Sequence, residues 1–160
     1  MWWILVAAGA QAAEPSAMNG HWRLDPDRSG ELMPFMKAVG FSWIERQVGK
    51  GSKPEHTISV AGDRSTIQVD TLSLGQEKRE TLTVNGRRAP TSARGFDSAS
   101  HVWTDAGVLV STMWGTRDDG AALVAVVERQ VVDDGTLRFD ISLTVDDASP
   151  MKVERVFVRQ

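Results

Sequence analysis

From about residue 55 to the C-terminus, apolar and polar residues alternate in short runs that turn residues separate at fairly even intervals. The clearest run extends from Leu137 to Val145, where every second residue is apolar. Such alternation is typical of strands with one buried and one solvated face, and Trp22, Trp103 and Trp114 fall within similar runs and are expected in the core. The turns include Asn85-Gly86, a pair that supplies the positive φ angles of tight hairpins. The pattern therefore predicts antiparallel strands joined by hairpins.

Residues 30 to 47 break this alternation. Leu32, Phe35, Met36 and Val39 recur at spacings of three and four, which indicates a helix, and Gly40 is a natural helix stop. We expect a short helix-turn-helix here, between a first strand near residues 20–24 and a second strand. About ten antiparallel strands with one helical insertion favour an all-β fold, either a closed up-and-down barrel or a sandwich, over a parallel α/β sheet.

The N-terminus carries an apolar run from Trp2 to Ala13 that ends in small residues, and Ala10-Gln11-Ala12 fits a small-x-small cleavage site. This predicts a signal peptide over residues 1–12 and one domain over residues 13–160, secreted or periplasmic if the segment is cleaved and cytoplasmic otherwise. No Lys or Arg precedes the run, so an ordinary first strand or a frayed end stays open. The run is too short to span a bilayer, and we expect no stable membrane insertion.

Net charge and residue content exclude several kinds of functional site. The net charge is −3 and there are no cysteines, which excludes disulfide scaffolds and thiolate sites and disfavours nucleic-acid binding. His21, His56 and His101 lie far apart in the sequence, and no serine stands in a Gly-x-Ser-x-Gly elbow. Paired aspartates stand beside turn residues, where turn chemistry explains them. We therefore expect no metal, no cofactor and no catalytic residues.

Three segments carry a resemblance to a known family. Residues 20–24 read Gly-His-Trp-Arg-Leu, residues 35–40 have the form of a first portal helix, and residues 153–157 read Val-Glu-Arg-Val-Phe. Together they resemble the intracellular fatty-acid-binding proteins of the calycin superfamily, strongly over residues 20–70 and faintly over 71–120. The resemblance implies a ten-stranded barrel, capped by two short helices, around a cavity for fatty acids or retinoid-like ligands.

Two arginines fall on apolar strand faces. Arg155 shares a face with Val153 and Phe157, and Arg129 shares one with Val127. Because charged residues are rarely buried without a partner, an arginine on each such face calls for an anion. From the residues alone, that anion could be a ligand carboxylate or a protein acid, and a bulge could turn either arginine to solvent. The resemblance places both arginines at head-group positions.

The resemblance also assigns the remaining site residues. The tyrosine with which the family binds the head group falls on Phe157, which has no hydroxyl to donate. Phe35, Met36 and Val39 are expected on the inner face of a helical portal, with Trp43 either in the core or at the portal. The predicted ligand-binding residues are Arg129, Arg155, Phe157, Phe35, Met36 and Val39.

These observations predict a monomeric, non-enzymatic carrier that holds a fatty acid or a similar hydrophobic carboxylate inside the barrel. The alternative is a lipocalin-like calycin domain that acts through its loops, as an interaction module or a small enzyme.

Overall fold

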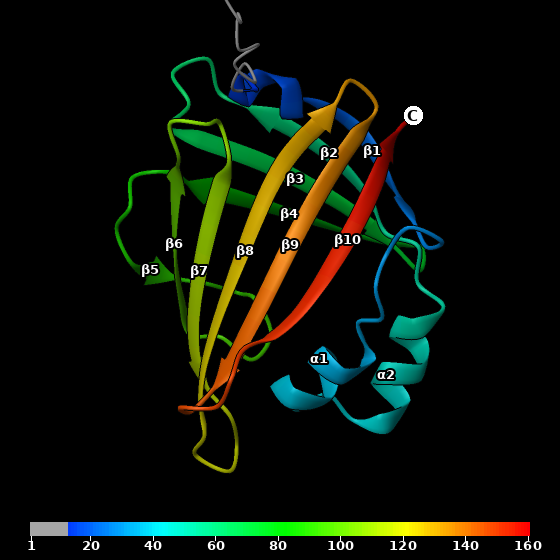
Figure 1. The fold of residues 1–160 in the computed structure, drawn as a ribbon, viewed down its shortest axis with the longest axis vertical. Coiled ribbons are helices and arrows are strands. Elements are labelled where there is room, and N and C mark those ends of the chain that lie inside the picture. Colours follow the sequence, from blue (N-terminus) through cyan, green and yellow to red (C-terminus); the bar gives the residue numbers. More distant parts are fainter. Residues whose placement is uncertain (1–12) are drawn as a thin grey trace, which may run out of the picture.

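The computed structural model describes residues 13–160, which form one ten-stranded antiparallel sheet with two helices between its first two strands (Figure 1). The strand order in the sheet is β4-β3-β2-β1-β10-β9-β8-β7-β6-β5. The strands are β1 (Gly20–Asp25), β2 (Glu55–Val60), β3 (Thr66–Ser73), β4 (Gln76–Thr83), β5 (Ala89–Pro90), β6 (Ser98–Trp103), β7 (Leu109–Thr116), β8 (Ala122–Asp133), β9 (Thr136–Val145) and β10 (Met151–Arg159).

Pairing between the first and last strands curls this sheet into a barrel. β1 pairs with β2 on one side and with β10 on the other, where Trp22 lies opposite Arg159. Strands β2 to β4 consequently lie across from β8 to β10 (Figure 1). Every other pairing joins neighbours in the sequence, and β4 and β5 form the two ends of the sheet. The predicted up-and-down barrel is confirmed, and the alternative of a sandwich is wrong.

The larger apolar core receives side chains from both halves of the curled sheet. Trp22 of β1, Ile67 of β3, Leu109 of β7 and Leu137 of β9 are fully buried within one cluster. Burial of an aliphatic side chain of this size contributes about 1.5–3 kcal/mol. The apolar positions of the alternating pattern therefore form the inner face of the barrel.

The three tryptophans expected in the core have different environments. Trp22 is completely buried, and Trp103 packs against the same cluster. Trp114 is half-buried on the other face of β7, where the Arg88 guanidinium lies 4.5 Å from its ring centroid. The inward positions of β7 belong to Leu109 and Ser111, so the expectation for Trp114 is wrong by one residue of register.

A short 3-10 helix, η1 (Pro15–Met18), closes one end of the barrel. Met18 is buried in the core and its carbonyl accepts a hydrogen bond from Trp22 Nε1 at 2.9 Å. Arg159 donates to the carbonyls of Ala17 and Asn19 and lies over the Trp22 ring. The predicted signal peptide over residues 1–12 lies outside the described residues.

Two helices, α1 (Met33–Val39) and α2 (Trp43–Lys50), lie at the other end of the barrel (Figure 1). Gly40 ends α1 with φ at 103°, a left-handed conformation that glycine adopts without strain. Ser42 and Glu45 begin α2 with a reciprocal capping box. The predicted helix-turn-helix is confirmed, with α2 three residues longer than expected. No helix within residues 13–160 is long and apolar enough to cross a membrane.

Candidate functional site

The two arginines singled out in the sequence lie in one row across the sheet. Arg129 of β8 pairs with Phe139 of β9, and Phe139 pairs with Arg155 of β10. The Cα atoms of the two arginines are therefore two strand spacings apart, about 10 Å. Directly paired residues share a face, so both arginines are on the same side of the sheet as Phe139.

Arg129 is a partly buried cation in contact with a hydroxyl group and an aromatic ring. Its Nη1 donates to Ser111 Oγ at 2.7 Å, and its guanidinium carbon lies 5.0 Å from the Phe139 ring centroid. Burial lowers the pKa of Arg129 to about 10, while the charge of Glu80 acts in the opposite direction. Arg129 thus carries its charge at pH 7. Within residues 13–160, no Asp or Glu oxygen lies within 4.0 Å of its guanidinium.

Two histidines that the sequence patterns did not single out lie close to Arg129. His101 Nδ1 forms a hydrogen bond of 2.8 Å with Ser111 Oγ, the same atom that Arg129 contacts. His56 Nδ1 forms one of 2.9 Å with Thr71 Oγ1. Burial, reinforced by the charge of Arg129, lowers the pKa of His56 to about 4 and also lowers the pKa of His101. Both imidazoles are accordingly neutral at pH 7.

Two phenylalanine rings pack beside Arg129 and His56. Phe157, which is buried, lies 4.7 Å from Phe139 and 4.9 Å from His56 between ring centroids. His56 is therefore in contact with Phe157. We call Arg129, His101, His56, Ser111, Phe139 and Phe157 the inner cluster.

Arg155 has different surroundings from Arg129. Its Nη1 donates to the backbone carbonyl of Gly30 at 3.0 Å, and burial lowers its pKa. It also borders a cavity of about 270 Å³ beneath the helices. The same cavity is lined by the predicted cap residues Phe35, Met36 and Val39, together with Phe41 and Phe96. The predicted site residues therefore lie in two groups. Arg155 lies beside Phe35, Met36 and Val39, whereas Arg129 and Phe157 belong to the inner cluster.

The side chains of Phe35, Met36 and Val39 lie on the side of α1 that packs against the barrel. Met36 and Val39 are buried, and Phe35 packs against a second apolar cluster that includes Leu123 and Leu143 of the barrel wall. Trp43, by contrast, is 66% exposed on α2, so it does not belong to the core.

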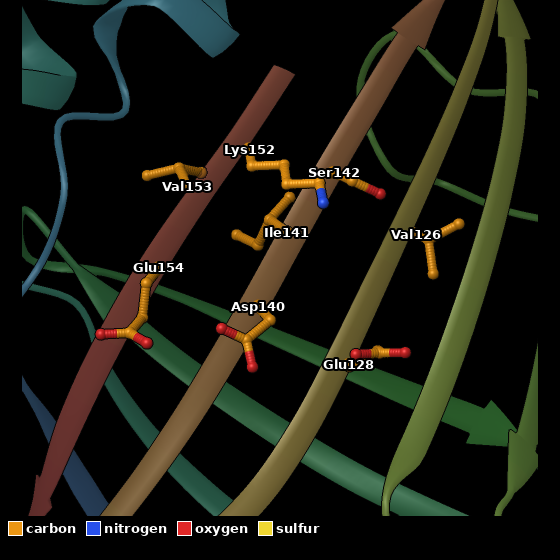
Figure 2. Close-up of a pocket in the computed structure, with 8 residues that line it drawn as sticks. All are labelled: Val126, Glu128, Asp140, Ile141, Ser142, Lys152, Val153 and Glu154. Atoms are coloured by element: carbon orange, nitrogen blue, oxygen red, sulfur yellow. The ribbon is translucent and has the colours of Figure 1, made fainter. Parts of the chain in front are cut away.

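A separate groove lies on the outer face of β8, β9 and β10. Figure 2 shows three carboxylates, Glu128, Asp140 and Glu154, side by side on the three strands, as the pairing register requires. Arg138 Nε lies 2.9 Å from the Asp140 carboxylate, and Lys152 lines the same groove. The described part of the chain holds no group of three or more His, Cys, Asp or Glu residues suited to a metal. Because Glu128 alternates with the buried Val127, this groove is a charged outer surface and does not reach the interior.

Comparison with known proteins gives a likeness in structure and none in sequence. No protein-family model matches the chain, and no curated protein matches it. Lipid binding protein 8 of Caenorhabditis elegans superimposes with a TM-score of 0.68 at 14% identity, over 90% of this chain and 96% of that one. The Schistosoma mansoni fatty acid binding protein, solved in complex with arachidonic acid, also gives 0.68, at 22% identity over 92% and 99%. Fatty-acid-binding protein 1 of Echinococcus granulosus gives 0.67, at 18% identity over 89% and 97%.

These three superpositions cover nearly the whole of each chain, and each of the three solved proteins carries a name for lipid or fatty-acid binding. At such identities the shared property is the fold. The protein therefore has the helix-capped, ten-stranded barrel fold of the fatty-acid-binding proteins, as the sequence resemblance predicted.

Proposed function

We propose that this protein is a non-enzymatic carrier that binds a fatty acid or a similar hydrophobic carboxylate inside the barrel. The observation that carries this proposal is the partly buried guanidinium of Arg129, which has a hydroxyl and an aromatic ring around it and no carboxylate within ion-pair distance in the described chain. A buried charge is costly without a partner of opposite sign. The planar fork of an arginine matches a carboxylate with two parallel hydrogen bonds.

The two halves of such a ligand would make different contributions. Burying methylenes contributes about 0.8 kcal/mol each, so a sixteen-carbon tail supplies up to roughly 11 kcal/mol before the cost of ordering. A hydrogen bond to a charged group contributes about 1.5–3 kcal/mol net. In this proposal the tail sets the affinity, while Arg129 selects a carboxylate over an ester or an alcohol.

In this proposal the hydrocarbon tail occupies the cavity beneath α1 and α2 and enters it between these helices and the barrel. The cavity beneath the helices is lined by Phe35, Met36 and Val39, and its volume of about 270 Å³ is below the range typical of sites for drug-sized ligands. A long tail would therefore need these side chains to move apart. In this proposal Arg155 contacts the ligand near the entrance, and Phe157 supplies an apolar wall below the head group.

The test is extraction of the purified protein with organic solvent, followed by titration with palmitic acid and with its methyl ester. We expect co-purified lipid and a preference of about tenfold or more for the acid, which Arg129→Gln abolishes. Arg138→Gln, which removes an arginine from the outer face of β9, serves as the matched control and should change neither affinity. If the wild type bound neither ligand, or bound both equally, the proposal would be wrong.

A second candidate function, an interaction module, is favoured by one feature. Trp43 and Ile44 are 66% and 68% exposed on α2, and Val48 on the next turn is also exposed. Large apolar side chains grouped on one surface mark contact sites for partners. A protein that contained no extractable lipid and bound no fatty acid would favour this alternative.

We also propose that residues 1–12 are removed during export and that the mature protein is a secreted or periplasmic monomer. The small-x-small motif at residues 10–12 supports this. Material from the native host should begin near residue 13 by mass spectrometry and should elute as a monomer. An intact N-terminus in a cytoplasmic fraction would contradict the proposal.

A further inference from the structure

A side cleft opens between the two ends of the sheet, where β4 faces β5 and β6. Its volume is about 400 Å³, and Leu82 and Ala99 line it together with Glu80 and His101. His101 is hydrogen-bonded to Ser111, which also contacts Arg129. The cleft therefore leads to the inner cluster.

Glu80 is an acid on the inner face of an edge strand. It pairs with Val69 of β3, a residue that packs against the larger apolar core, and it alternates with the buried Leu82. Its neighbour Arg79 is on the opposite face, where it forms an ion pair with Asp70 at 2.7 Å. Glu80 is half-buried, so its carboxylate is partly shielded from water.

Glu80 forms no ion pair with Arg129, but its charge acts on two residues of the inner cluster. The negative charge of Glu80 raises the pKa of both Arg129 and His101, against the effect of burial. Among residues 13–160, the titratable groups whose charges act on one another here are Glu80 on β4, His101 on β6, Arg129 on β8 and His56 on β2. With both histidines neutral, Arg129 and Glu80 balance each other, and a ligand carboxylate would add a second negative charge.

We propose that Glu80 is a specificity-determining residue that opposes a ligand carboxylate at Arg129, and so limits the preference of the site for anionic over neutral head groups. This inference rests on the proposed function. Two like charges that share a partly desolvated site repel each other by an energy that corresponds to roughly a three- to thirtyfold change in affinity. A neutral head group would not experience this repulsion.

The experiment titrates wild type, Glu80→Gln and Glu77→Gln with palmitic acid and with its methyl ester. Glu77 is on the same strand and is exposed, so Glu77→Gln makes the same change of charge outside the barrel. We expect Glu80→Gln to bind the acid about 3 to 30 times more tightly and to bind the ester as wild type does. Glu77→Gln should leave both affinities unchanged. Glu80→Ala should match Glu80→Gln for the acid.

The outcomes separate the two proposals. If wild type prefers the acid and Glu80→Gln and Glu80→Ala bind it no more tightly, this inference is wrong and the proposed function stands. An equal gain for acid and ester would also overturn it, because removal of Glu80 would then act through packing. If wild type binds neither ligand, the proposed function fails, and this inference fails with it.

Discussion

Arg129 and Arg155 are the same residue type on the same face of one sheet, on either side of Phe139, yet their surroundings differ. Arg129 lies within the inner cluster and donates to the Ser111 side chain, which is 1% exposed. Arg155 borders the cavity beneath the cap and donates to a backbone carbonyl in the loop before α1. The comparison shows that a shared row does not give a shared environment, because depth in the barrel determines how strongly each charge is desolvated.

The largest effect that would sharpen this comparison is a pH dependence from His56 of the inner cluster. Its folded pKa of about 4 lies below the ordinary value of 6.5. The unfolded chain therefore binds a proton first as the pH falls, and the free energy of unfolding decreases between about pH 6.5 and pH 4. The total loss from this residue is up to about 3 kcal/mol.

Urea denaturation across this pH range measures the loss. In His56→Phe the free energy of unfolding should depend less steeply on pH than in the wild type. A wild-type slope in His56→Phe would mean that the inner cluster is more hydrated than its burial indicates.

The second prediction compares the two arginines directly. Arg129→Gln should weaken palmitic acid binding by about 10- to 100-fold, since a charge-assisted hydrogen bond contributes about 1.5–3 kcal/mol. Arg155→Gln should weaken it by less than about fivefold, because that side chain is less desolvated and is already bonded to Gly30. Titration of both variants with the acid and the methyl ester measures the ratio. Equal losses for acid and ester would show that the arginines support the fold and do not contact the head group.

The third prediction concerns the mobility of the cap relative to the barrel wall. Every residue of α2 is at least partly exposed, whereas β9 contains the buried Leu137 and Leu143. Amide hydrogens of α1 and α2 should therefore exchange at least about tenfold faster than those of Leu137 to Val145 in lipid-free protein. Hydrogen exchange followed by NMR or mass spectrometry measures this, and added palmitic acid should slow exchange in the cap. Equal protection of both regions would argue against a cap that opens.

The smallest predicted effect is local to α2. Ser42→Ala removes the side-chain acceptor of the capping box and should destabilise the helix by about 1 kcal/mol. Because α2 has no fully buried side chain, this change should raise exchange in the cap while the free energy of global unfolding changes by less than about 0.5 kcal/mol. Ser59→Ala on β2 provides a control outside the cap. A full 1 kcal/mol loss in global stability would show that cap and barrel unfold together.

Local patterns in the sequence determined most of the fold. The alternation in Leu137 to Val145 and the spacing of Phe35, Met36 and Val39 predicted a strand and a helix, since both periods are set by backbone geometry within one element. The same alternation placed Arg129 and Arg155 on inward faces. The resemblance at residues 20–24 and 153–157 supplied the barrel topology, which β1 and β10 complete by pairing.

Only the tertiary structure decided which side chains meet. His56 and His101 are far apart in the sequence, and they lie near Arg129 because closure of the barrel brings β2, β6 and β8 around one interior. The alternation test that selected the arginines could have selected these histidines as well, since His56 alternates with the buried Ile58. No local pattern shows that Arg129 is more desolvated than Arg155 or that Glu80 faces the side cleft. These properties depend on how the curled sheet packs against itself and against the cap. They are set by contacts between different strands and not by the residue pattern within one strand.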